Sequence, residues 1–252
     1  MIEVFILSLI QGVTEFLPIS SSSHLIVVSD YLNFEKQNLT IDVSLHIGSF
    51  IAVVTYFSKD IVNFVKNKDL FFKIIISSLP VMIVGYFLVE YNLINYFRNI
   101  KIIGWTTIIF GVLLYISDQF KLEKKIDNNF TVKDAIFIGF LQILSLVPGV
   151  SRSGITITAA RFLNFDRFDS AKISFLFSIP TLGAVTFFGV HNLINQEDLS
   201  ISLLNLISIL LSFVFSFITI KYFLKFIKKF SLYIFVIYRI ILGILILSFG
   251  YL

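Results

Sequence analysis

The chain of 252 residues is 57% hydrophobic and 16% aromatic, and only 14% of it is charged, against about 25% in a typical soluble domain. Its mean hydropathy is +0.91, its net charge is +4, and it contains no cysteine. A soluble domain of this size could not bury so much apolar surface, which excludes a secreted domain, a nucleic-acid-binding protein and an ordinary cytosolic enzyme. Without cysteine there are no disulfides or thiolate metal sites. We therefore predict an all-α polytopic membrane protein.

The first apolar region, residues 2–32, is interrupted before it can cross a bilayer. Pro18 and the serines at 20–23 divide it into halves of about 10–16 residues, whereas a spanning helix needs about 17–25. We predict a re-entrant helical hairpin that enters and leaves on one side. No basic residue precedes Lys36 and no small-residue cleavage site is evident, so we interpret the segment as mature structure and not as a signal peptide.

Six later segments are long and apolar enough to span the membrane. They lie at about 41–58, 70–90, 100–118, 170–190, 200–221 and 232–251. Between the third and the fourth, residues 132–163 are interrupted by Pro148-Gly149 and by the polar run 151–154. This broken region predicts a second re-entrant hairpin.

Counting crossings puts both termini and the first hairpin on one side of the membrane, and the second hairpin on the other. The second side carries fifteen basic residues: Lys59, Lys66, Lys68, Lys73, Lys121, Lys124, Lys125, Lys133, Arg161, Arg167, Lys172, Lys221, Lys225, Lys228 and Lys229. The first side carries three, namely Lys36, Arg98 and Lys101, and its last loop contains Glu197 and Asp198. The positive-inside rule makes the second side cytoplasmic, so we expect both termini outside.

The two halves of the chain resemble each other at a shift of about 130 residues. Gln11 aligns with Gln142, and Pro18 with Pro148. Each unit would hold one hairpin and three spans, and the odd number of crossings would invert the second unit. We predict an inverted-topology repeat whose broken segments meet near the midplane; chance similarity between apolar segments is the alternative. The units are expected at about 1–120 and 131–252 of a single integral membrane domain, 1–252.

The first hairpin carries a carboxylate in an apolar setting. Gln11 and Glu15 are four residues apart and share a helix face. A charge at the centre of a membrane helix costs about 2.5–3.5 kcal/mol, so Glu15 is expected to face protein or water. It could hold Mg²⁺ or Ca²⁺ with Gln11 adding a neutral oxygen. The alternative is a carboxylate satisfied by buried serines.

The serine run that follows ends in a histidine. Most of these serines would cap the second helix of the hairpin. His24 lies one turn beyond Ser21, and a histidine beside a serine can act as its general base, or itself as acid or nucleophile. We therefore predict Ser21 and His24 as catalytic residues, with the nucleophile left open between them.

The second polar loop, Pro148 to Thr156, combines glycines, hydroxyls and an arginine. Gly149 and Gly154 permit tight turns and close approach to a ligand, and a helix N-terminus is an anion site. Arg152 adds a planar fork that matches phosphate oxygens. A pairing of Arg152 with Glu15 purely for packing is the alternative. The predicted phosphate-binding residues are Ser151, Arg152, Ser153, Gly154 and Thr156.

If the hairpins meet, these groups suit a phosphate or diphosphate at membrane depth, with or without a divalent metal, and the apolar walls suggest a lipid-linked phosphate. This chemistry alone does not separate hydrolysis from transport. Three other polar residues are interpreted as structural. We expect His46 to pack against polar groups, His191 to be solvated, and Arg239 to snorkel or to pair with another group. The lysines at 221–229 suggest contact with anionic lipid.

At its two loops the chain closely resembles the bacterial undecaprenyl-diphosphate phosphatase family, also called the bacitracin-resistance protein family, over essentially its whole length. The segments that carry the resemblance are Gln11–Glu15, Pro18–His24 and Pro148–Thr156. The resemblance implies hydrolysis of C55 isoprenyl diphosphate to the monophosphate and phosphate, recycling of the lipid carrier for peptidoglycan synthesis, and bacitracin resistance. It also implies a divalent cation, Mg²⁺ or Ca²⁺, and a plasma-membrane location. The expected partners are the isoprenyl diphosphate lipid and the bilayer, with a homodimer considered and no nucleic acid.

Carried over to this sequence, the resemblance makes Glu15, Ser21, His24 and Arg152 the catalytic residues, with Glu15 and Gln11 at the metal. Many relatives have Glu at the position of Gln11, which cannot supply charge or act as a base. His46 stands where relatives often carry Gln. A polyprenyl-phosphate transporter or flippase that uses the same repeat is the competing interpretation. The other common class of membrane lipid phosphatase would need a Lys/Arg–Arg-Pro motif and a second catalytic histidine, and neither occurs.

Overall fold

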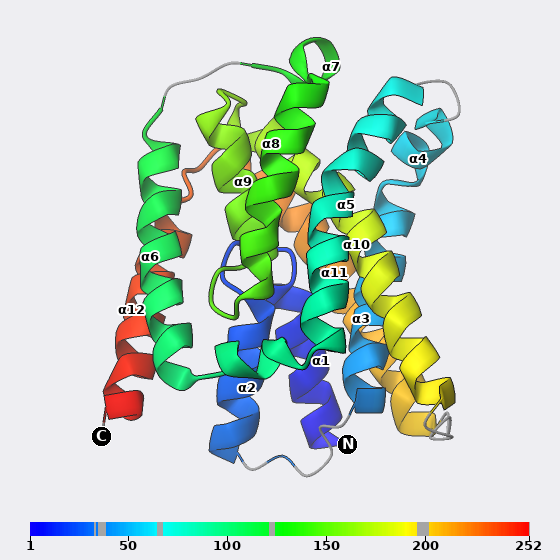
Figure 1. The fold of residues 1–252 in the computed structure, drawn as a ribbon, viewed down its shortest axis with the longest axis vertical. Helices are drawn as coiled ribbons and strands as arrows, with labels where there is room; N and C mark the ends of the chain where they lie inside the picture. The colour runs from blue at the N-terminus through cyan, green and yellow to red at the C-terminus, as the bar shows by residue number, and fades with distance from the viewer. Residues whose placement is uncertain (33, 35–38, 65–67, 121–123, 196–201, 252) are drawn as a thin grey trace.

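The computed structural model describes residues 1–32, 34, 39–64, 68–120, 124–195 and 202–251 (Figure 1). Every named element in these ranges is a helix, and the one β-type contact found there is an isolated bridge between Lys124 and Phe165. The prediction of an all-α protein is confirmed. Five residues used in the sidedness argument lie outside the described ranges: Lys36, Lys66, Lys121, Glu197 and Asp198.

Six of the described helices are long and apolar enough to cross a membrane, as predicted. They are α3 (Leu39–Tyr56), α5 (Lys68–Glu90), α6 (Ile100–Asp118), α10 (Arg167–Asn195), α11 (Leu203–Ile227) and α12 (Tyr233–Tyr251). At their C-terminal ends α10 and α11 run about five residues further than predicted. A helix can continue past the hydrocarbon layer, and the long stems of Lys221 and Lys225 allow their charged ends to reach the polar interface.

Four shorter helices form two hairpins. The first is α1 (Ile2–Thr14) and α2 (Ser21–Leu32), and the second is α8 (Val132–Gln142), a 3₁₀ turn η2 (Ile143–Leu146) and α9 (Arg152–Phe162). At 1.5 Å per residue the longest of them spans about 20 Å, less than the roughly 30 Å of a hydrocarbon core. In Figure 1 the first hairpin enters from the lower end and the second from the upper end, and their turns meet near mid-height.

The remaining elements connect the spans at the two ends of the molecule. These are α4 (Ser58–Phe64) and α7 (Ile126–Asn129) at the upper end and the 3₁₀ helix η1 (Leu93–Phe97) at the lower end, where both termini also lie (Figure 1). A hairpin followed by three spans occurs twice along the chain. The inverted repeat at about 1–120 and 131–252 stays a prediction.

Side chains cap the N-termini of both helices of the second hairpin. The Thr131 side chain accepts a hydrogen bond from the Asp134 amide at 3.2 Å, and the Asp134 carboxylate accepts one from the Thr131 amide at 2.9 Å. This capping box satisfies donors at the start of α8. At the turn, Ser151 caps α9 by accepting from the Gly154 amide at 3.1 Å. The entry and the turn of the hairpin are therefore encoded locally.

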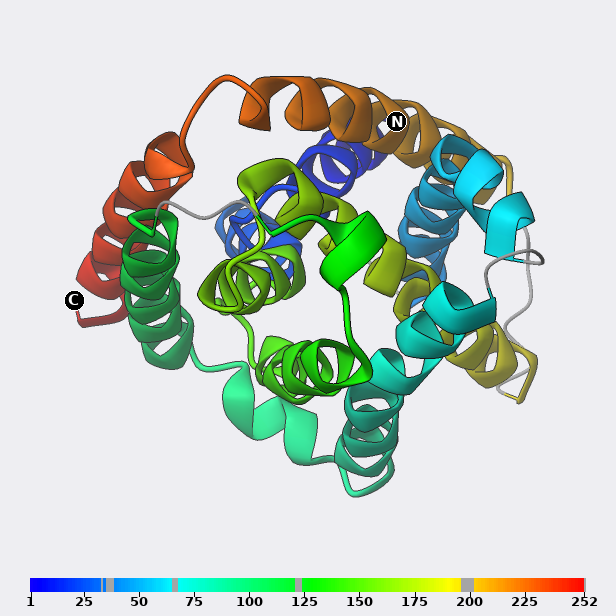
Figure 2. The ribbon, with the colours of Figure 1, turned by 90° about the horizontal axis from the view of Figure 1, so that it is seen from above.

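Helix α9 lies inside the bundle. Seen from above, it is surrounded by the longer helices (Figure 2), and its residues from Ser153 to Arg161 are all buried. Because α9 faces protein and not lipid, it can carry hydroxyl side chains that a lipid-facing helix would expose to hydrocarbon. The fold thus delivers the N-terminus of a polar helix to the centre of an apolar molecule.

Small residues let α11 approach both α1 and α3 closely. A Cβ atom at Gly48 would collide with the carbonyl oxygen of Ile209, and one at Gly12 would lie 2.9 Å from the backbone nitrogen of Ser216. Ser49 and Ser216 share a hydrogen bond of 3.0 Å between their hydroxyls. Small side chains and hydroxyl pairs are typical of helix contacts in membranes, and here they fix α1 beside the spans.

Candidate active site

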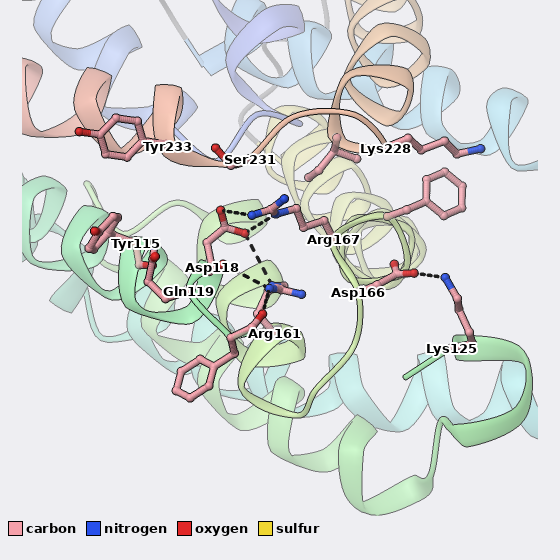
Figure 3. Close-up of a pocket in the computed structure, with 13 residues that line it drawn as sticks. Tyr115, Asp118, Gln119, Lys125, Arg161, Asp166, Arg167, Lys228, Ser231 and Tyr233 are labelled. Carbon is pink, nitrogen blue, oxygen red and sulfur yellow. Dashed lines mark hydrogen bonds and ion pairs between the residues drawn. The ribbon is translucent and has the colours of Figure 1, made fainter. Parts of the chain in front are cut away.

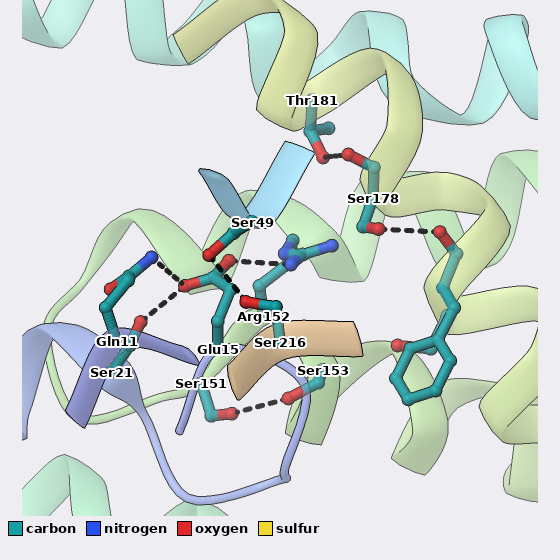
Figure 4. Close-up of polar contacts among 12 residues, drawn as sticks. Gln11, Glu15, Ser21, Ser49, Ser151, Arg152, Ser153, Ser178, Thr181 and Ser216 are labelled. Carbon is teal, nitrogen blue, oxygen red and sulfur yellow. Dashed lines mark hydrogen bonds and ion pairs between the residues drawn. The ribbon is translucent and has the colours of Figure 1, made fainter. Parts of the chain in front are cut away.

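The turns of the two hairpins are joined by a buried ion pair. Arg152 Nη2 donates to Glu15 Oε1 at 2.7 Å (Figure 4). The Arg152 side chain is 13% exposed and the Glu15 side chain 8%. Residues 137 positions apart therefore form one group, as the predicted meeting of the hairpins requires.

The other oxygen of Glu15 accepts two further hydrogen bonds. Gln11 Nε2 donates to Glu15 Oε2 at 3.1 Å, and Ser21 Oγ donates to the same oxygen at 2.6 Å (Figure 4). Gln11, Glu15, Ser21 and Arg152 are thus connected directly. The carboxylate is the centre of the site, and it is the acceptor that holds the Ser21 proton.

Two polar atoms of this group remain without a partner. Arg152 Nη1 and Gln11 Oε1 are buried and form no hydrogen bond with any residue that the structure describes. A buried unsatisfied donor or acceptor costs about 1–3 kcal/mol. The site therefore offers one cationic donor to an anion and one amide oxygen to a cation or a water molecule.

Both hairpins turn through a serine with left-handed backbone conformation. Ser20 has φ 75° and precedes α2, and Ser151 has φ 71° and precedes α9. This region is unfavourable for residues with a side chain, and such strain clusters at functional sites. In both cases the next residue is the first of its helix, Ser21 or Arg152, and in both cases it contacts Glu15.

Gly149 allows the second loop to press against α6. Its φ is 95°, and a Cβ atom there would collide with Thr106 Oγ1 and lie 2.7 Å from the carbonyl oxygen of Ile103. Thr106 Oγ1 donates to the carbonyl oxygen of Pro148 at 2.7 Å. Only glycine fits this combination of conformation and space.

The hydroxyls of the second loop connect the two turns. Ser153 Oγ donates to the carbonyl oxygen of Leu17 at 2.7 Å, and it lies 3.1 Å from Ser151 Oγ. Thr156 is fully buried, and its hydroxyl lies 2.7 Å from Ser174 Oγ on α10 and 2.8 Å from the carbonyl oxygen of Arg152. Contacts of Ser151, Ser153, Gly154 and Thr156 with a phosphate stay predictions.

His24 lies beside this group but is bonded elsewhere. Its Nδ1 is 2.6 Å from the carbonyl oxygen of Ser20 and its Nε2 is 2.6 Å from the hydroxyl of Tyr238. Since a carbonyl only accepts, Nδ1 carries a proton, and in the neutral ring Nε2 accepts from the phenol. Among the described residues His24 forms no hydrogen bond with Ser21, whose proton is directed to Glu15. The geometry thus offers Glu15, and not His24, as the base for Ser21.

On α12, Tyr238 contacts His24 and Arg239 contacts the two turns; sequence reasoning gave Tyr238 no role and Arg239 only snorkelling or pairing. Arg239 is fully buried and donates to four backbone carbonyls: Pro18 at 3.1 Å, Thr107 at 3.1 Å, Gly149 at 2.7 Å and Val150 at 3.1 Å. Snorkelling is therefore wrong for this arginine, because its guanidinium has protein carbonyls to bind at the centre of the molecule. An arginine inside a span must find such partners, and that was the available signal.

The two other histidines differ in their distance from the site. His46 lies close enough to Glu15 to interact with it electrostatically, and its Nδ1 is 2.8 Å from the carbonyl oxygen of Asp42. It therefore belongs to the surroundings of the carboxylate, a place that the packing interpretation did not give it. His191 is exposed and stacks on Phe187 with 6.3 Å between ring centroids.

Taken together, the site is a buried cation with a free donor, a carboxylate that holds a serine proton, and a helix N-terminus, all at the meeting point of two turns. A cationic fork and free N–H groups can bind and stabilise a phosphoryl group. A carboxylate hydrogen-bonded to a serine hydroxyl can accept its proton during attack. The arrangement suits phosphoryl transfer to a serine or to water.

Known proteins resemble this chain along nearly its whole length. The family model of the Bacitracin resistance protein BacA matches residues 4–245. A protein of Pelagibacter ubique named undecaprenyl-diphosphatase is 50% identical over 97% of this chain and 95% of its own length. Proteins of the same name from a Jannaschia species and from Saccharophagus degradans are each 39% identical; the first match covers 98% of both chains, the second 94% of this chain and 93% of its own.

Proposed function

The chain belongs to the Bacitracin resistance protein BacA family, and from this membership and its site we propose that it is an undecaprenyl-diphosphate phosphatase. It hydrolyses C55 isoprenyl diphosphate to the monophosphate and inorganic phosphate. This reaction returns the lipid carrier to peptidoglycan synthesis and protects against bacitracin. The observation that carries the proposal is the buried Glu15–Arg152 pair with Ser21 on one carboxylate oxygen and a free Arg152 Nη1.

The second loop binds the terminal phosphoryl group. Arg152 Nη1 donates to a phosphate oxygen, and the N-terminus of α9 supplies the positive end of the helix dipole. Phosphoryl transfer depends mainly on positioning and charge stabilisation. Because Arg152 and Glu15 are largely buried, each of these donors stabilises charge more strongly than it would in solution.

Ser21 is the nucleophile that the geometry favours. Its Oγ attacks the terminal phosphorus while its proton passes to Glu15 Oε2, and the bond from that phosphorus to the bridging oxygen breaks. The lipid monophosphate leaves with the bridging oxygen. Water then hydrolyses the phosphoserine, which releases inorganic phosphate and restores the Ser21 hydroxyl. Attack by His24 Nε2, or by water that His24 activates, is the alternative.

The two nucleophiles leave different phosphoenzymes. Trapping the protein during turnover and mapping the phosphate should place it on Ser21 as an acid-stable ester. An acid-labile phosphate on His24 would instead assign the attack to the histidine. A single-turnover experiment that finds neither, with reaction rates unchanged in Ser21→Ala, would favour direct attack by water.

The oxygen atoms around Glu15 fit a divalent cation that takes most of its ligands from the substrate and from water. Glu15 and the unpartnered Gln11 Oε1 supply two oxygens, and the described residues contain no cluster of three carboxylate or imidazole ligands. Mg²⁺ commonly binds through one or two carboxylates together with substrate phosphates. Such an ion, Mg²⁺ or Ca²⁺, would neutralise charge on the diphosphate. Because Gln11 is neutral, we expect Glu15 to determine cation affinity.

The deciding experiment is phosphate release from C55 isoprenyl diphosphate by the purified protein, with and without EDTA. Release that requires the cation and is lost in Arg152→Ala and Ser21→Ala would support the proposal. A polyprenyl-phosphate transporter that uses the same site is the second candidate, favoured by the opposed hairpins. Well-folded protein that binds the lipid diphosphate but releases no phosphate would replace the phosphatase by this transporter.

We place the protein in the bacterial plasma membrane with both termini and the first hairpin outside, so that the substrate reaches the site from the outer face. The basic ends of the described helices gather at the opposite end of the molecule, which the positive-inside rule makes cytoplasmic. Labelling of a single cysteine introduced at Glu3 by a membrane-impermeant reagent in whole cells tests this orientation. A homodimer is a further prediction, which light scattering of the detergent complex tests.

A further inference from the structure

A large cavity opens at the end of the molecule away from the termini. It has a volume of about 1110 Å³, slightly above the range of about 300–1,000 Å³ that is usual for ligand pockets. Its walls are the C-terminal ends of α6, α9 and α11 and the N-terminal ends of α10 and α12 (Figure 3). Arg152 and Arg161 stand at opposite ends of α9, about 14 Å apart along the helix, so this cavity is separate from the site around Glu15.

Positive charge exceeds negative charge among the described residues that line this cavity. Four cationic side chains face two carboxylates, a surplus of two positive charges. We call this space the basic cavity. Its cations are Lys125, Arg161, Arg167 and Lys228, and its carboxylates are Asp118 and Asp166.

Each carboxylate is already occupied. Asp118 is 3% exposed and receives both Arg167 Nε at 2.6 Å and Arg167 Nη2 at 3.0 Å, and its Oδ2 also accepts from the Leu232 amide at 3.0 Å. Asp166 pairs with Lys125. The two carboxylates leave the lining with an excess of two positive charges, although Arg161 also pairs with Asp118, with 3.8 Å between Arg161 Nε and Asp118 Oδ1.

Arg161 is a buried cation with incomplete hydrogen bonding. Its side chain is 4% exposed, its Nη1 donates to the carbonyl oxygen of Phe165 at 2.9 Å, and its Nη2 donates to the carbonyl oxygens of Phe120 and Asp118. Its Nε finds no acceptor among the described residues and lies 3.8 Å from Asp118 Oδ1. Lys228, on the opposite wall, has its Nζ 4.2 Å from the centre of the Phe168 ring. An anion that enters the basic cavity would gain charge-assisted hydrogen bonds from the cations of its lining.

The rim of the basic cavity is aromatic. Tyr115 of α6 and Tyr233 of α12 stand with 6.0 Å between ring centroids, and they are 41% and 53% exposed. Phe120 beside them is 48% exposed. Tyrosines gather where the bilayer meets water. Acyl chains can follow this rim while a charged group enters the cavity.

We propose that the basic cavity is a second phosphate-binding site, which takes the phosphate of an anionic phospholipid headgroup or free inorganic phosphate. Basic pockets between membrane helices on the cytoplasmic side bind lipid headgroups of this kind. The cavity would bind the phosphate through the cations of its lining, Lys228 among them.

The test is native mass spectrometry of the full-length protein in neutral detergent, titrated with phosphatidylglycerol and, separately, with phosphatidylcholine. We expect one tightly bound phosphatidylglycerol and no comparable phosphatidylcholine. Lys228→Gln should weaken binding about fivefold, the effect of one cation near a phosphate. Lys229→Gln is the matched control, since Lys229 is the adjacent lysine and does not line the cavity. Arg152→Gln should leave this binding unchanged.

Inorganic phosphate added to the lipid complex separates the two sources. Retention of the lipid in millimolar phosphate, with the Lys228 dependence, identifies a headgroup site. Stoichiometric phosphate binding that depends on Lys228, without lipid binding, identifies a site for the free ion. Equal weakening by Lys228→Gln and Lys229→Gln, loss of binding in Arg152→Gln, or no binding of either ligand would overturn the proposal.

Discussion

Replacing Arg239 by methionine should loosen the turns of both hairpins at once. The guanidinium donates to the carbonyl oxygens of Pro18 in the first turn and of Gly149 and Val150 in the second. Methionine has a similar length but no donor, so these buried carbonyls lose their partner. The expected result is a protein that still folds but no longer holds Arg152 against Glu15.

The magnitude follows from the hydrogen bonds. A bond from a charged donor contributes about 1.5–3 kcal/mol, and Arg239 makes four. Methionine also removes the cost of burying a guanidinium without a carboxylate, which is several kcal/mol. We expect a net loss of about 3–5 kcal/mol, or about 10 °C in Tm. A displacement of the turns by about 1 Å would lower kcat about a hundredfold.

The assay compares Tm in detergent and phosphate release for the wild type, Arg239→Met and Arg239→Lys. Arg239→Lys keeps the charge, but lysine has no planar fork with which to donate to both turns. In this variant we therefore expect a strong loss of phosphate release with a smaller loss of Tm. Lys229→Met, at an exposed position, controls for loss of a cation. Wild-type Tm and turnover in Arg239→Met would refute the role of Arg239 in positioning the turns.

Three further predictions concern single contacts of the site. Tyr238→Phe removes the hydroxyl on His24 and should lower kcat about 2- to 13-fold at unchanged KM, since one hydrogen bond contributes about 0.5–1.5 kcal/mol; unchanged steady-state kinetics would show that this bond is dispensable. Gly149→Ala should destabilise the protein by about 1–3 kcal/mol because of its positive φ, and an unaltered melting curve would contradict this. Glu15→Gln should abolish phosphoserine formation and lower turnover more than a hundredfold; a rate close to wild type in stopped-time assays would remove Glu15 from proton transfer.

The sequence predicted the hairpins because their signals are local. Pro18 and Pro148 interrupt apolar runs that are too short on either side to span a bilayer, and a polar run begins at Ser20 after the first and at Ser151 after the second. The grouping of Gln11 with Glu15 also follows from helical spacing alone. Such features need no knowledge of the tertiary structure, and the structure places both turns where these patterns put them.

The pairing of side chains could not be read in the same way. Spacing put His24 next to Ser21, but Ser21 starts its helix after the left-handed Ser20, and its hydroxyl points back to Glu15. Tyr238 is 214 residues from His24, and no periodicity links the two. Both contacts depend on how α12 packs against the hairpins, which is a property of the folded molecule.

The proposed reaction gives the ion pair between the hairpins a role beyond packing. Before reaction, Glu15 partly neutralises Arg152 through Nη2, and the phosphoryl group can add at Nη1 without displacing the carboxylate. When Ser21 attacks, its proton passes to Glu15, and the carboxylate loses its charge. The full positive charge of Arg152 then acts on the phosphoryl oxygens as the bond to the bridging oxygen breaks, which is when stabilisation lowers the barrier. Proton transfer and charge stabilisation are therefore coupled through one carboxyl group.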